Sequence, residues 1–285
     1  MSKKKPSILG RLLWAGFGAA IALFGVAVYL TPTAQDKLAA FFNSNFSTAF
    51  FGAVGGSLTI IAIEWFRRQR QVLADINTSI GVLTSLSNTL LNMKQQHVLP
   101  LVQNYNTNLS KFQTMQTLKM LIPEPKQPMV FSFEMYMKRF YCPQLHFDVP
   151  MERIFTLTDK VPQIVMIITQ TKRTIGEVEN ACSAWNAAVE ELKSKQGDDK
   201  IAFYFGVGKD NDITDTVFPD TIANLNSVAN DGLFFIKRAT DSLTKLGQKT
   251  LPPWLRKKIA RSKIISKEHR DLMPSDDYKE GWDNE

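Results

Sequence analysis

Two long apolar stretches near the N-terminus constrain this 285-residue chain more than any other feature of its sequence. They cover residues 8–30 and 46–66, and each exceeds the roughly 18 residues that a helix needs to cross the hydrocarbon of a membrane. Inside lipid, every backbone N–H and C=O group must be paired within the segment, which favours helices. The sequence therefore predicts a hairpin of two transmembrane helices.

Basic residues flank this hairpin on one side only. The flanking basic residues are Lys3, Lys4, Lys5 and Arg11 at the first stretch and Arg67, Arg68 and Arg70 after the second. Because positive charge stays on the cytoplasmic side, we expect an integral membrane protein with both termini in the cytoplasm, in a bacterial-type inner membrane. A cleaved signal peptide is the alternative for residues 8–30, but that apolar run is too long for one.

The part that follows the apolar stretches is large enough to bury a core of its own. About 215 residues remain, which is an ordinary domain size. Its only cysteines are Cys142 and Cys182, a number typical of a reducing compartment without a disulfide framework. We therefore expect an ordered domain held together by packing alone.

An apolar repeat with alternating steps of three and four residues is clearest between residues 154 and 192. Such a repeat predicts a long helix in a bundle or coiled coil, and Pro162 within it predicts a kink or a division into two pieces. Its positions are Ile154, Leu157, Val161, Ile164, Ile168, Thr171, Ile175, Val178, Cys182, Trp185, Val189 and Leu192.

Two further repeats predict two more long helices. The later repeat includes small residues that suggest a close approach to a neighbouring helix. Its positions are Ile222, Leu225, Ala229, Gly232, Ile236, Ala239, Leu243 and Leu246. The earlier repeat occupies Val72, Ile76, Ile80, Leu83, Leu86, Leu90, Met93 and His97.

Together these patterns predict an all-α fold. A two-helix transmembrane hairpin precedes a cytoplasmic bundle of three or four long helices with coiled-coil-like heptads. Proline and aromatic residues in the insertion 122–150 indicate a lid packed over the bundle or, alternatively, a pocket. The predicted parts are a basic N-terminus (1–7), the hairpin (8–66), the bundle (67–247), and a basic amphipathic helix with an acidic tail (248–285).

The first helix of the predicted bundle has few charges on its surface. Between residues 71 and 118 the only charged side chains are Asp75, Lys94 and Lys111. A solvated helix normally carries pairs of Glu and Lys, whereas uncharged polar side chains cost less to remove from water. The pattern favours contact with other copies or with another helical membrane protein over a merely polar surface.

Small residues in the apolar stretches are typical of membrane helices that pack closely. The predicted packing residues are Gly18, Ala22, Gly25, Gly52 and Gly56. At the inner boundary, Glu64 precedes Arg67 and Arg68 by three and four residues, which places all three on one helix face. We expect an ion pair there.

A basic segment near the C-terminus predicts a helix lying on the anionic membrane surface. The alternatives are a solvated or bundle-capping helix and contact with nucleic acid, which is the least favoured. The residues predicted to dock on the bilayer are Trp254, Arg256, Lys257, Lys258, Arg261 and Lys263.

The sequence shows no catalytic motif. Cys142, His146 and Asp148 are too few for a closed zinc site, which takes four ligands. The segment 206–210 has the sequence GVGKD, without the upstream glycine and the Ser or Thr of a phosphate-binding loop. We expect no catalytic residue, no metal and no cofactor.

These observations favour a non-catalytic, membrane-anchored bundle that acts in assembly, scaffolding or signal relay. The alternative is an oligomeric membrane effector whose transmembrane hairpins form a pore or perturb the bilayer. A third hypothesis is an enzyme with its pocket beneath the aromatic insertion 131–147.

Overall fold

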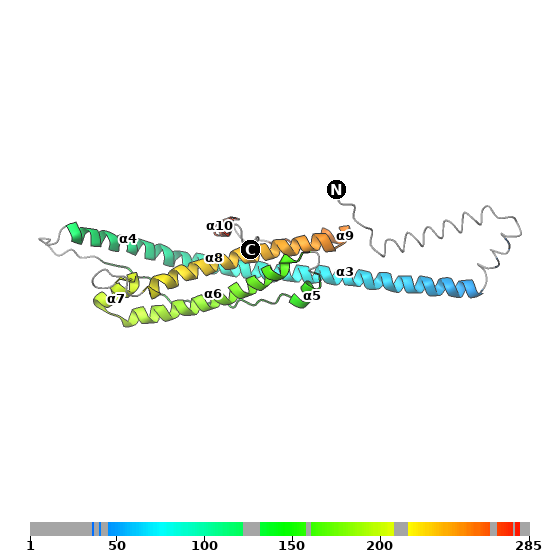
Figure 1. Ribbon diagram of the computed structural model, residues 1–285, viewed down its shortest axis with the longest axis horizontal. Coiled ribbons are helices and arrows are strands. Elements are labelled where there is room, and N and C mark those ends of the chain that lie inside the picture. Colours follow the sequence, from blue (N-terminus) through cyan, green and yellow to red (C-terminus); the bar gives the residue numbers. More distant parts are fainter. Residues whose placement is uncertain are drawn as a thin grey trace. The chain divides into compact units, whose positions relative to one another are not determined.

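The computed structural model describes residues 36, 40, 45–121, 132–157, 161–207, 216–262, 267–275 and 277–279. The regular elements in these ranges are helices, so the predicted all-α class is confirmed for the part of the chain that is described (Figure 1). The chain divides into two compact units, Met1–Arg68 and Gln69–Glu285. The second unit holds the helical bundle.

Long helices make up most of the described chain. They are α3 (Asn45–Met93), α4 (Leu99–Leu121), α6 (Gln163–Ser194) and α8 (Val217–Thr250), and the short π-helix η1 (Lys94–Val98) joins α3 to α4. The shorter helices are α5 (Met151–Phe155), α7 (Gly197–Phe205), α9 (Pro253–Arg256) and α10 (Lys267–Asp271).

The predicted localisation is wrong. Within the described residues, no helix has both the length and the apolar character that crossing a membrane requires. The stretch 8–30 lies outside these residues. The stretch 46–66 belongs to α3, where small and hydroxyl-bearing residues separate the aliphatic ones, whereas a spanning helix needs about 20 predominantly apolar residues. The interrupting residues are Gly52, Gly55, Gly56, Ser57 and Thr59.

This correction removes the basis of several related predictions. The two-span hairpin, the cytoplasmic orientation and the bacterial-type inner membrane all depended on spanning helices. The hypothesis of a pore formed by transmembrane hairpins depended on them as well. The prediction of a helical bundle is independent of the spans and is confirmed for the described residues.

Helix α8 forms the centre of the bundle, beside α6 and the second half of α3 (Figure 1). Every position of the apolar repeat predicted between residues 222 and 246 is buried. A Cβ atom added at Gly232 would lie 3.0 Å from Leu90 Cδ1 and 3.7 Å from Val178 Cγ2, so this glycine faces α3 and α6 together. The close approach predicted from the small residues of this repeat is therefore present.

The two prolines at helix boundaries explain local departures from a straight α-helix. Pro100 lacks an N–H group and its ring crowds the carbonyl one turn before it. The preceding turn, Lys94–Val98, widens into a π-helix, in which the Leu99 N–H donates to the Lys94 carbonyl. Pro162 precedes the first residue of α6 and separates it from α5, as its place in the repeat predicted.

Asparagine side chains fasten the insertion to the bundle. Residues 132–150 form no helix or strand. Asn186 Nδ2 donates to the Phe140 carbonyl (2.8 Å), and Asn186 Oδ1 accepts from the Phe140 N–H (3.1 Å). Asn104 pairs in the same way with the Glu134 carbonyl (2.8 Å) and the Tyr136 N–H (3.0 Å). These amides replace the backbone partners that an irregular segment lacks, and the described part of the insertion, residues 132–150, packs as a lid.

The close contact at Gly232 leads to a stability prediction. Gly232→Val should lower the free energy of unfolding by about 1–3 kcal/mol, because the added methyl groups overlap Leu90 and Val178 in a packed core. The matched control is Gly176→Val in α6, where an added Cβ meets nothing within 4 Å. Urea unfolding of the full chain measures both. Equal effects at the two positions would contradict the proposed packing.

Candidate functional site

The exposed side of α4 carries small hydroxyl-bearing residues at steps of three and four. They are Thr107, Ser110, Thr114 and Thr117, and we call them the hydroxyl face. All four are exposed, and they line shallow surface grooves along the helix. The spacing places them in one row on the same side of α4.

Each hydroxyl of this face is hydrogen-bonded within its own helix. Thr107 Oγ1 donates to the Gln103 carbonyl at 2.9 Å, and Ser110 Oγ donates to the Asn106 carbonyl at 3.0 Å. Thr114 and Thr117 donate to the Ser110 and Gln113 carbonyls at 2.9 and 3.0 Å. A partner could cover these groups without breaking a hydrogen bond that the protein supplies, so the cost of removing them from water is low.

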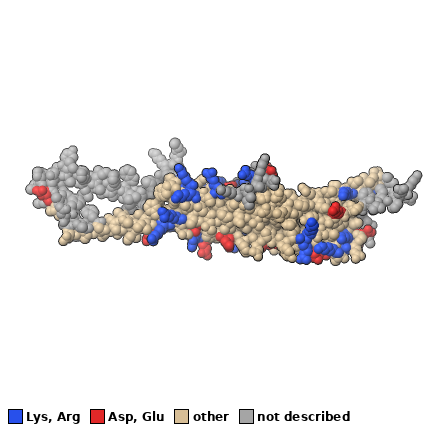
Figure 2. Space-filling model, turned by 180° about the vertical axis from the view of Figure 1, so that it is seen from behind, with Lys and Arg blue, Asp and Glu red and all other residues tan. Residues whose placement is uncertain are grey.

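Charge is sparse around the hydroxyl face. Lys111 and Lys119 are the only charged residues of α4. Figure 2 shows that much of the described surface on one side of the molecule carries neither basic nor acidic side chains. At the end of α4, Met120 and Leu121 are each 72% exposed. This end of the helix therefore combines apolar and uncharged polar groups.

The core explains why this side of α4 is exposed. Only Leu101, Asn108 and Phe112 of α4 are buried. Phe112 stacks on Phe205 with ring centroids 4.3 Å apart, and this contact anchors the middle of the helix to α7. Residues 113–121 contain no buried side chain. The last turns of α4 thus contribute little to the fold of this chain.

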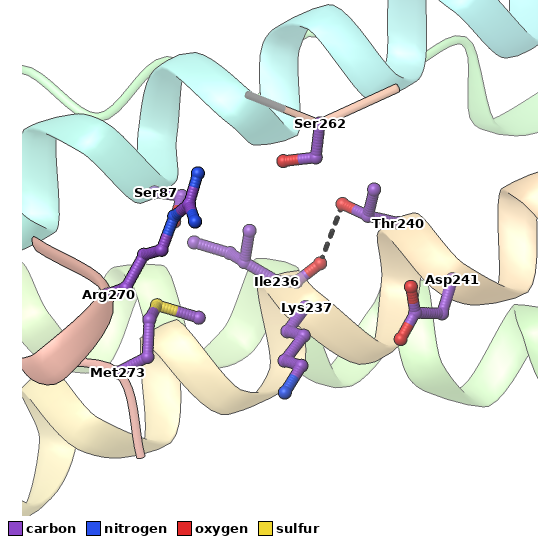
Figure 3. A pocket seen from close by; sticks show the side chains of 8 residues that line it. All are labelled: Ser87, Ile236, Lys237, Thr240, Asp241, Ser262, Arg270 and Met273. Atoms are coloured by element: carbon purple, nitrogen blue, oxygen red, sulfur yellow. Dashed lines mark hydrogen bonds between the residues drawn. The ribbon is translucent and has the colours of Figure 1, made fainter. Parts of the chain in front are cut away.

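A cavity of about 300 Å³ lies between α3, α8 and the C-terminal segment, which we define as residues 251–262, 267–275 and 277–279 (Figure 3). Hydroxyl groups, two cations, one carboxylate and two apolar side chains surround it. The lining residues are Ser87, Ile236, Lys237, Thr240, Asp241, Ser262, Arg270 and Met273.

The C-terminal segment is fastened along α3 by polar side chains. Asn77 Nδ2 donates to the Lys258 carbonyl (3.1 Å), and Asn77 Oδ1 accepts from the Ala260 N–H (2.7 Å). Further along, the hydroxyls of Thr84 and Ser262 lie 3.3 Å apart. α3 and α8 form two walls of the cavity. These contacts hold the C-terminal segment in place as the remaining wall.

Lys94 joins three parts of the bundle from the π-helix. Its Nζ donates to Asn230 Oδ1 on α8 and to the Leu272 carbonyl of the C-terminal segment, both at 2.6 Å. Lys94 is 8% exposed, and burial lowers its pKa because the charged amine is costly to remove from water. The two neutral acceptors stabilise the ammonium group only in part.

The residues predicted for membrane packing are not brought together by the described structure. Gly18, Ala22, Gly25 and the boundary residue Arg11 lie outside the described residues. An added Cβ atom at Gly52 or Gly56 meets nothing within 4 Å. Glu64, Arg67 and Arg68 are exposed, and the structure shows no ion pair between the glutamate and either arginine.

The described residues predicted to dock on a bilayer do not form the amphipathic helix that the sequence predicts. The helix there, α9, contains only four residues. Trp254 is 52% exposed, whereas Arg256 Nε donates to the Leu251 carbonyl (2.8 Å). Lys257, Lys258 and Arg261 are exposed, and Lys263 lies outside the described residues. Around residues 258–260, pairing of the backbone with Asn77 replaces the predicted basic amphipathic helix.

The possible metal ligands are separated from one another. Cys142 hydrogen-bonds to Cys182, and this contact together with burial raises the pKa of the Cys182 thiol. His146 Nε2 lies 3.3 Å from Gln144 Oε1 at the surface. Across the described ranges, no group of three or more His, Cys, Asp or Glu side chains is placed to hold a metal ion.

Comparisons with known proteins find no match for this chain among protein-family models, curated proteins or solved structures.

The scarcity of charge in this region is evident from the sequence, whereas the hydroxyl face was not predicted. The signal was present as a row of Thr and Ser at steps of three and four, running beside the apolar positions. The cavity had no such signal, because residues 87, 240 and 270 meet only after folding.

The buried amine of Lys94 predicts a dependence of stability on pH. Its folded pKa lies below its unfolded value, so the cost of burying the charge is present at neutral pH. As the pH rises through the folded pKa, the amine loses its proton first in the folded protein, and this cost disappears. The stability of the wild type relative to Lys94→Met should therefore increase as the pH rises from neutral toward the ordinary lysine pKa of about 10.5.

Urea unfolding of the full chain at several pH values measures this difference. Lys245→Met removes an exposed lysine of α8 and controls for the loss of one positive charge. A constant difference between wild type and Lys94→Met over the whole range would contradict the burial of a charged amine.

Proposed function

We propose that this chain is a non-catalytic assembly protein, whose copies associate through the hydroxyl faces of their α4 helices. The observation that carries the proposal is the hydrogen bonding of this face. All four hydroxyls donate to carbonyls of their own helix, so contact with a second copy leaves no donor unpaired.

The size of the side chains supports close packing of two such helices. Serine and threonine rows let helix backbones approach, whereas long charged side chains hold them apart. Interhelical distances of about 8–10 Å allow the facing side chains to interlock. The segment 103–121 would provide a contact about 28 Å long at the rise of an α-helix.

A second copy is the partner that this surface fits best. A two-fold axis places the same patch of both copies in contact, which requires a surface that is complementary to itself. An uncharged face meets this requirement, because identical charges would otherwise face one another. Lys111 lines one of the grooves, but it is exposed and its long side chain lets the ammonium group remain in water. The exposed Met120 and Leu121 add apolar contact at the helix end.

Charge placed in the hydroxyl face should prevent association. In Ser110→Glu, two carboxylates would approach across the two-fold axis, and we expect the dissociation constant of the dimer to increase at least about tenfold. Ser183→Glu in α6 is the matched control, because Ser183 is also exposed and donates to the carbonyl four residues before it. Sedimentation equilibrium of the full-length chain measures both variants.

A wild-type protein that stays monomeric would contradict the proposal. An equal loss of association in both variants would contradict the placement of the contact on α4. Circular dichroism and urea unfolding verify that each variant keeps its fold, so that loss of association is not confused with unfolding.

A further inference from the structure

The cavity beside the C-terminal segment is lined by charged side chains of both signs. Lys237 and Arg270 line it together with a single carboxylate, that of Asp241. Arg270 extends from the C-terminal segment toward Ser87, whereas Lys237 and Asp241 extend from α8 away from Ser262 (Figure 3). Among the described residues, no carboxylate forms an ion pair with Arg270. Its guanidinium group is therefore available to an anion.

Ser87 adds a second polar group to the same end of the cavity. Its side chain lines the cavity although the residue is only 4% exposed. The described part of the structure contains no hydrogen bond from its hydroxyl. Because the hydroxyl oxygen is accessible from the cavity, it can take a partner there. A ligand in the cavity could supply that partner by accepting a hydrogen bond from Ser87.

The remaining walls of the cavity are partly apolar. Ile236 comes from α8 and Met273 from the C-terminal segment. Thr240 donates its hydroxyl proton to the Ile236 carbonyl (2.9 Å), so its oxygen can only accept. Arg270 and Ser87 thus supply donors beside apolar surface. Apolar surface next to them favours a ligand with one charged end and one apolar end.

We propose that this cavity binds a small organic anion in which a carboxylate or phosphate group carries a short apolar arm. The anionic group pairs with Arg270 and accepts a hydrogen bond from Ser87. The apolar arm packs against Ile236 and Met273. The volume of about 300 Å³ lies at the lower end of the range for ligand pockets, which fits a small molecule.

The position of the cavity gives binding a structural consequence. Ser87 belongs to α3, Ile236 to α8, and Arg270 to the C-terminal segment. A ligand that contacts all three ties the segment to the bundle and stabilises the folded chain by mass action. This proposal does not depend on the assembly of α4, because the two sites have no residue in common.

Hexanoate is a suitable probe, with hexanol and inorganic phosphate as comparisons. We expect ligand-observed NMR titration of the full chain to show saturable binding of hexanoate. Hexanol lacks the charge and phosphate lacks the apolar arm, so both should bind more weakly. Arg270→Gln should weaken hexanoate binding about tenfold or more, because the charge-assisted hydrogen bonds are lost. Ser87→Ala should weaken it by a smaller factor.

Arg261→Gln is the matched control, since Arg261 is exposed beside Ser262 but does not line the cavity. It should bind hexanoate like the wild type. Absence of saturable binding would overturn the proposal. Equal affinity of wild type and Arg270→Gln would also overturn it, as would equal binding of hexanol and hexanoate.

Discussion

The burial of α8 against α3 and α6 is the interaction on which the rest of this fold depends. Gly232 allows α8 to approach Leu90 and Val178 at once, and an added Cβ at this position would be tightly crowded. Near the other end of α8, Gly247 makes room for Ile259, whose Cδ1 would lie 2.8 Å from an added Cβ. One helix therefore positions both the bundle and the C-terminal segment.

The apolar repeats predicted the bundle because a helix face shows in the spacing of a single segment. Each position between 222 and 246 is buried as expected, and Pro162 divides the helices at the predicted place. Contacts between distant segments were not predictable in this way. The pairing of Asn186 with Phe140 and of Asn77 with residues 258 and 260 depends on tertiary structure. That pairing explains why the basic segment does not form a long helix.

The two candidate sites differ in how the polar groups of each are arranged by the fold. On α4, the hydroxyls are satisfied within the helix, and the face is exposed because the buried side chains of α4 are Leu101, Asn108 and Phe112 on another side. In the cavity, Arg270 and Ser87 are brought to the same lining from segments far apart in the sequence. The first arrangement suits association with another helix, and the second suits a small anion.

Hydrogen exchange of the wild-type chain at low and high protein concentration tests the proposed assembly most directly. If copies associate through the hydroxyl face, amide exchange in residues 103–121 should slow as the concentration rises, since the contact stabilises the end of α4. Exchange in α6 around Ser183 should not change. Exchange in α4 that is independent of concentration, in a range where the mass of the protein increases, would contradict the account.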